Sequence, residues 1–120
     1  MLLPPQTNNY TVLNRADAVI SVNSKSGAEA LLLGKPVVVM GDAFYRSCPL
    51  VYAVDRLADV PARLREALTA GAFDPASGAL YFEAAWRKSL PGELYIGDAK
   101  LLDTFAASLR TAIGGPASAN

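Results

Sequence analysis

The sequence predicts an α/β fold in which a small parallel sheet is flanked by helices. Two β-branched runs, residues 18–22 and 37–40, have the length of strands, and their continuous apolar character is typical of strands covered on both faces. Strong helix formers occupy residues 28–33 between them. A strand, a helix and a second buried strand in succession indicate a parallel pair joined by a right-handed crossover.

The elements next to this unit follow from local signals. Residues 10–16 can form a short helix ahead of the first strand. Gly34 is expected to end the helix over residues 28–33, because glycine readily adopts the left-handed backbone found at helix ends. A third, shorter strand is expected over residues 51–54, which completes a Rossmann-like pattern.

Three helices are expected in the rest of the chain. Asp59 is a candidate cap for a helix that reaches Ala70, with apolar residues recurring at helical spacing along one face. The next helix is expected to begin at Asp74 and Pro75, since a capping aspartate followed by proline is a frequent helix start. Asp98 is the candidate cap of the last helix.

We expect one Rossmann-like domain over residues 10–114. Proline and asparagine pairs predict a disordered or extended lead-in over residues 1–9. The glycines and proline that follow the last helix predict a frayed tail over residues 115–120.

The composition argues against several classes of function. The 120 residues are 52% hydrophobic and 18% charged, which suits one buried core and not a disordered chain. Eleven basic and eleven acidic residues cancel, so nucleic-acid binding through a basic face is not expected. The chain has no histidine, which removes the commonest general base, and Cys48 has no second cysteine to pair with. The sequence shows no membrane-length apolar run, so we expect a cytoplasmic protein.

The turn between the first strand and the following helix is the candidate anion site. In a parallel α/β sheet, ligands bind beyond the carboxyl ends of the strands, where a helix N-terminus offers unpaired amides and a partial positive charge. Ser24, Ser26 and Gly27 fit such a site, because hydroxyls donate to phosphate oxygens and glycine permits close approach. Lys25 adds a positive charge, and Asn23 is a further candidate residue of this turn.

The same residues have a purely structural interpretation. Ser26 and Glu29 match a capping box, in which the glutamate reaches back to the backbone of the cap and the residues do no more than start a helix. Glu29 also lies where a carboxylate could accept hydrogen bonds from ribose hydroxyls. Spacing alone leaves both interpretations open, and both can hold together.

Residues after the second strand are candidates to line a cleft at the same edge. Asp42 is a possible polar contact, or a turn residue after Gly41. Phe44 and Tyr45 could stack on a base or sugar, or pack locally. Arg46 could pair with a carboxylate or phosphate, or stand exposed on the surface.

Several motifs stand in order between residues 16 and 45. They are a strand ending in Asn23-Ser24, the helix start Gly27-Ala28-Glu29-Ala30-Leu31, the turn Gly34-Lys35-Pro36, and the segment Gly41-Asp42-Ala43-Phe44-Tyr45. This stretch resembles the capsule polysaccharide biosynthesis family, whose members include bacterial Kdo transferases. Residues 90–95 look like a weaker echo of the family pattern.

The resemblance implies the C-terminal, donor-binding half of a GT-B glycosyltransferase. It assigns the donor phosphate to Ser24, Ser26 and Gly27, the ribose to Glu29, and the cleft lining to Asp42, Phe44 and Tyr45. The implied donor is a CMP-sugar, CMP-Kdo, bound as a substrate, and no metal or other cofactor is expected because the helix dipole and side chains neutralise the departing phosphate. Catalytic groups are expected in an N-terminal half outside this chain, so the chain alone is expected to be inactive.

Other interpretations stay open. The chain could be a nucleotide-sugar-binding module, or an epimerase-like GT-B half, without transfer activity of its own. It could also be an interaction domain in which the turn acts only as a cap. Under the glycosyltransferase interpretation, the expected partners are the nucleotide sugar, a glycan or glycolipid acceptor, a separate N-terminal acceptor domain and the inner-membrane surface.

Overall fold

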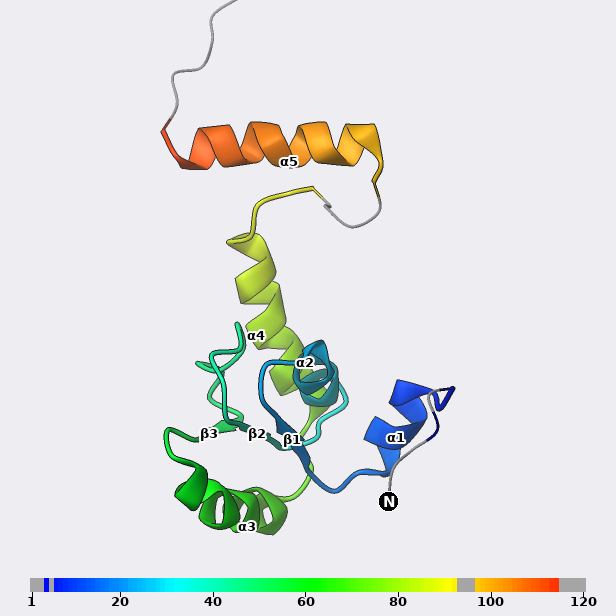
Figure 1. Ribbon diagram of the computed structural model, residues 1–120, viewed down its shortest axis with the longest axis vertical. Helices are drawn as coiled ribbons and strands as arrows, with labels where there is room; N and C mark the ends of the chain where they lie inside the picture. Colours follow the sequence, from blue (N-terminus) through cyan, green and yellow to red (C-terminus); the bar gives the residue numbers. More distant parts are fainter. Residues whose placement is uncertain (1–3, 5, 93–96, 115–120) are drawn as a thin grey trace, which may run out of the picture. The chain divides into compact units, whose positions relative to one another are not determined.

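The computed structural model describes residues 4, 6–92 and 97–114 (Figure 1). The predicted tail and parts of two other predicted segments lie outside the described residues. These parts are residues 1–3 and 5 of the lead-in and residues 93–95 of the weaker motif echo.

The chain divides into two compact units, residues 1–83 and residues 84–120. The first unit contains the sheet and every residue of the predicted site. One domain over residues 10–114 stays a prediction.

Three short strands form one parallel sheet in the order β1-β2-β3 (Figure 1). They are β1 (Val19–Ser21), β2 (Val37–Val39) and β3 (Val51–Ala53). Val37 lies opposite Val19 on one side and opposite Val51 on the other. This sheet and its flanking helices confirm the predicted Rossmann-like α/β fold.

The described residues form five α-helices and one short 3-10 helix. They are α1 (Asn9–Arg15), α2 (Lys25–Leu32), η1 (Leu57–Asp59), α3 (Val60–Ala70), α4 (Pro75–Arg87) and α5 (Ala99–Ala112). Helix α1 begins one residue before its predicted start. Helix α2 begins at Lys25, three residues before the predicted residue 28, so it starts within the candidate site.

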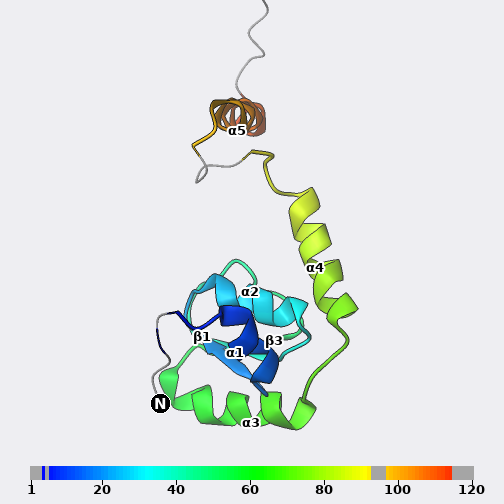
Figure 2. The same cartoon turned by 90° about the vertical axis from the view of Figure 1, so that its right-hand side faces the viewer.

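The sheet is covered on both faces, which explains why all three residues of β2 are buried. Val37 and Val39 pack in a core cluster with Leu31 of α2. Val38 points to the other face and packs with Ala67 of α3. Helices α2 and α3 lie on opposite sides of the sheet (Figure 2). Burying each of these valines contributes about 1.5–3 kcal/mol, and the two-sided burial accounts for the unbroken apolar run.

Two of the three predicted aspartate caps have formed. The Asp74 carboxylate accepts the Ala76 N–H at 3.0 Å, and the Asp98 carboxylate accepts the Leu101 N–H at 3.1 Å. Asp59 precedes α3, but its side chain makes no capping hydrogen bond to the described residues. The reason is that Asp59 is itself the last residue of η1, so its backbone is helical and not extended as a capping residue requires.

Gly34 ends the α2 segment as predicted. Its φ of +71° lies in the left-handed region, and its carbonyl accepts the Phe73 N–H at 2.9 Å. A side chain here would be strained by this backbone and would also meet the Pro75 ring at 3.2 Å.

Candidate functional site

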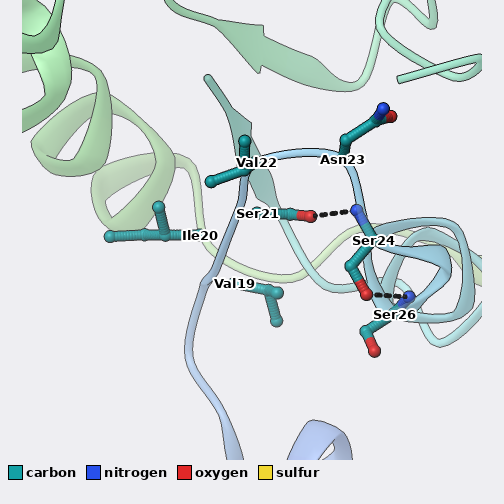
Figure 3. Close-up of a pocket in the computed structure, with 7 residues that line it drawn as sticks. All are labelled: Val19, Ile20, Ser21, Val22, Asn23, Ser24 and Ser26. Carbon is teal, nitrogen blue, oxygen red and sulfur yellow. Dashed lines mark hydrogen bonds between the residues drawn. The ribbon is translucent and has the colours of Figure 1, made fainter. Parts of the chain in front are cut away.

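The turn from β1 into α2 borders an open hollow that runs along β1 and past its carboxyl end (Figure 3). The hollow has a volume of about 540 Å³. It is lined by Val19, Ile20, Ser21, Val22, Asn23, Ser24 and Ser26. Figure 3 shows the polar side chains Asn23, Ser24 and Ser26 along the turn and helix start, and the apolar Val19 and Ile20 along the strand. The hollow therefore has one polar side and one apolar side.

Three backbone amides of the turn already have partners within the protein. The Ser24 N–H donates to Ser21 Oγ at 3.1 Å, and the Ser26 N–H donates to Ser24 Oγ at 3.2 Å. The Gly27 N–H donates to the Ser24 carbonyl at 3.1 Å. The expectation of unpaired amides is therefore wrong for these three groups.

The capping residue of α2 is Ser24, two residues earlier than the predicted capping box implies. The backbone of Ser24 is extended, and its side chain caps the Ser26 amide. Ser26 lies in the first turn of the helix, so Glu29 does not reach back to a Ser26 cap. The structural interpretation is right that a serine caps this helix and wrong about which serine.

Tyr45 lies buried beneath the turn and does not line a cleft, which corrects that part of the prediction. Its side chain is 1% exposed. Tyr45 Oη lies 2.5 Å from the Ser24 carbonyl, to which it donates, and 3.2 Å from Ser21 Oγ. The phenol thus ties the loop after β2 to the turn after β1. Sequence reasoning missed Ser21, which is also buried and carries a hydroxyl in this network.

Gly27 is required by Tyr45. A Cβ atom at Gly27 would overlap the Tyr45 hydroxyl and would lie 2.6 Å from Cζ and 2.8 Å from Cε2 of the ring. The position has ordinary helical backbone, so space and not conformation demands glycine here. The prediction that Gly27 lets a ligand approach the backbone closely is therefore wrong on this side, because the Tyr45 ring already occupies the space that the missing Cβ leaves.

A second hollow, of about 480 Å³, lies at the carboxyl ends of β2 and β3. It is lined by Asp42, Ala43, Phe44, Arg46, Ser47 and Ala53. Asp42 and Phe44 therefore stand at the predicted edge of the sheet. Phe44 is 66% exposed and makes edge-to-face contacts with Tyr45 and Phe82, so it packs locally on one side and stays open to solvent on the other.

Arg46 takes the first of its two predicted roles, pairing with a carboxylate. Its guanidinium donates to Asp55 at 2.5 Å. It also donates to the carbonyls of Gly41 at 3.1 Å and Val54 at 3.3 Å, at the ends of β2 and β3. The side chain is 25% exposed, so Arg46 joins two strand ends and does not project freely from the surface.

Glu29 is held by a residue that sequence reasoning did not single out. Asn9 Nδ2 lies 2.5 Å from Glu29 Oε2 and 3.4 Å from Ser26 Oγ, and it donates to both. Asn9 is the first residue of α1, and Leu13 of the same helix is buried in the core cluster that contains Leu31 of α2. No local sequence pattern predicts this contact, because it depends on the packing of α1 against α2.

The other candidate residues are placed as follows. Asn23 lines the first hollow, and Lys25 is the exposed first residue of α2. Cys48 is buried, and burial raises the pKa of its thiol. In the part of the chain that the structure describes, no group of three or more metal-binding side chains comes together, and no helix is long and apolar enough to cross a membrane.

The fold and the site define a Rossmann-like α/β protein with a serine-rich turn at the carboxyl edge of its sheet. Residues 1–58 match the family model described as capsule polysaccharide biosynthesis protein. The matched region runs from α1 to η1 and contains every predicted site residue, and it supports the capsule polysaccharide biosynthesis family for this part of the chain. No curated protein and no solved structure matches the chain.

Proposed function

We propose that the chain is the donor-binding part of a glycosyltransferase of capsular polysaccharide biosynthesis. In this proposal, the complete enzyme transfers Kdo from a CMP-sugar to a lipid-linked or glycan acceptor, and the catalytic groups lie in a separate acceptor domain. The observation that carries the proposal is the family match over residues 1–58, which covers the polar turn at the carboxyl edge of the sheet.

The side chains of the turn keep donors for a phosphate even though three amides are engaged. Ser24 Oγ and Ser26 Oγ each accept a hydrogen bond, from the Ser26 amide and from Asn9 respectively. Accepting leaves the hydrogen of each hydroxyl available to donate. Both hydroxyls stand at the N-terminus of α2, whose dipole favours an anion there. The donor phosphate is therefore proposed to be held by two hydroxyl groups and the helix dipole.

Glu29 is proposed to bind the ribose of the donor. It lies one turn into α2 and is half-buried, and within the described residues no hydrogen bond reaches its second oxygen, Oε1. A carboxylate oxygen in this position can accept from a ribose hydroxyl. Phe44 and Asp42 at the neighbouring strand end are proposed to line the cleft toward the base or sugar.

A titration of the 120-residue chain with CMP, followed by amide NMR signals, tests the donor site. We expect CMP to shift the signals of residues 24–29, with UMP as the comparison for base selectivity. The double variant Ser24→Ala, Ser26→Ala should weaken binding about tenfold or more, because both hydroxyl donors are lost. Ser77→Ala, in the first turn of α4 in the same unit, is the matched control and should leave binding unchanged. If neither cytidine nor uridine nucleotides move the signals of residues 24–29, the proposed donor site is wrong.

A further inference from the structure

At Asn9, helix α1 contacts two side chains of α2 that belong to the proposed donor site, Ser26 and Glu29. Asn9 Nδ2 carries two hydrogens, and its two partners are Glu29 Oε2 at 2.5 Å and Ser26 Oγ at 3.4 Å. Both hydrogen bonds lie at an exposed position, and the bond to Glu29 has an ionised acceptor, which makes it the stronger of the two. One carboxamide group therefore holds the carboxylate and the hydroxyl at the same time.

The hydrogen bonds of Asn9 select which atoms of its partners remain available. Glu29 is left with Oε1 as an acceptor, and Ser26 is left with its O–H as a donor. An acceptor suits a ribose hydroxyl, and a donor suits a phosphate oxygen. Without Asn9, both side chains could rotate freely among rotamers, and ordering them would oppose ligand binding.

The position of Asn9 is itself well determined. Asn8 caps α1 by accepting the amides of Tyr10 and Thr11, so the first turn is fixed. Leu13, one turn further on, is buried in the core cluster. Asn9 is therefore presented to α2 from a helix that is anchored at two points.

We propose that Asn9 is a positioning residue that orders Glu29 and Ser26 for a ligand with a diol next to an anionic group, such as a nucleoside monophosphate moiety. This inference rests on the proposed function and assigns a role that the family resemblance does not. Asn9 acts through Glu29 and Ser26, and its own two donor hydrogens are already used.

The test is CMP titration of the 120-residue chain and its Asn9→Ala variant. Asn14→Ala is the matched control, because Asn14 is the same residue type in the same helix, and its side chain donates to the Tyr10 carbonyl and not to α2. We expect Asn9→Ala to weaken CMP binding about three- to tenfold and Asn14→Ala to leave it unchanged. Asn9→Asp should weaken binding further, since it removes the donors and places a second carboxylate beside Glu29.

A second measurement separates positioning from general loss of structure. If Asn9 acts through Glu29 and Ser26, then Asn9→Ala should weaken binding less in a Glu29→Ala background, where only Ser26 is left for Asn9 to order, while thermal unfolding of Asn9→Ala shows an intact fold. Equal effects in both backgrounds, or unchanged or tighter binding by Asn9→Ala, would overturn this inference while leaving the donor site in place. A wild-type chain that binds no nucleotide overturns the donor site and this inference together.

Discussion

Replacing Gly27 by alanine tests the interpretation that Tyr45, and not a ligand, dictates glycine at the start of α2. The added Cβ would lie 2.6 Å from Tyr45 Cζ, far inside van der Waals contact. The ring cannot swing away easily, because it is buried and its hydroxyl is bonded to the Ser24 carbonyl. We therefore expect Gly27→Ala to destabilise the protein.

The change in the free energy of unfolding follows from two destabilising contributions and one stabilising contribution. Overpacking at a rigid site costs about 1–3 kcal/mol, and displacing the Tyr45 hydroxyl from its partner costs about 1 kcal/mol more. Alanine has the higher helix propensity, which offsets about 0.5–1 kcal/mol. The net effect is a loss of about 2 kcal/mol, or a fall in Tm of roughly 8 °C for a chain of this size.

Urea unfolding followed by circular dichroism measures this loss. The informative control is the same change in a Tyr45→Leu background, where the hydroxyl and the ring are absent. Gly27→Ala should cost much less there, because the atoms that its Cβ would strike are gone. If Gly27→Ala costs as much in the Tyr45→Leu background as in the wild type, or if it stabilises the wild type, the reasoning is refuted.

Two further predictions concern the loop that follows β2. Arg46→Met should cost about 1–2 kcal/mol in urea unfolding, because it leaves the Gly41 and Val54 carbonyls without their guanidinium partner. Arg63→Met, which breaks an exposed ion pair in α3, should leave the unfolding midpoint unchanged, and equal effects would contradict the role given to Arg46. Burial raises the pKa of Cys48 in the folded protein above its ordinary value of 9.0. As the pH rises, the thiol therefore ionises in the unfolded chain before it ionises in the folded one. The folded state keeps its full stability below the ordinary pKa and loses stability as the pH rises above it. The free energy of unfolding should therefore fall more between about pH 8 and about pH 10 in the wild type than in Cys48→Ala, and parallel curves would contradict this assignment.

Local signals were enough to predict the strands and the α-helices of the first unit, but not the 3-10 helix η1. The apolar run of β2 and the stop at Gly34 depend on residues that are neighbours in the chain, so the sequence displays them directly. Asp59 shows the limit of this approach. It has the right residue type at the right place, yet a 3-10 turn before α3 changes its backbone and removes the cap.

The chemistry of the candidate turn was harder to predict because distant residues decide it. The predicted box placed the cap at Ser26, whereas the helix begins earlier and Ser24 caps it. Tyr45 binds Ser24 from 21 positions away, and Asn9 reaches Glu29 across 20 positions. Contacts of this range depend on how α1 and the loop after β2 pack, which no spacing rule contains.

The charge of Arg46 is paired within the protein at the carboxyl edge of the sheet. Backbone carbonyls at the ends of β2 and β3 are hydrogen-bond acceptors at this edge. The guanidinium donates to the carbonyls of Val39, Gly41 and Val54, and it is also paired with the Asp55 carboxylate. Arg46 also lines the second hollow, so an anion that entered there would have to compete with Asp55 for the guanidinium.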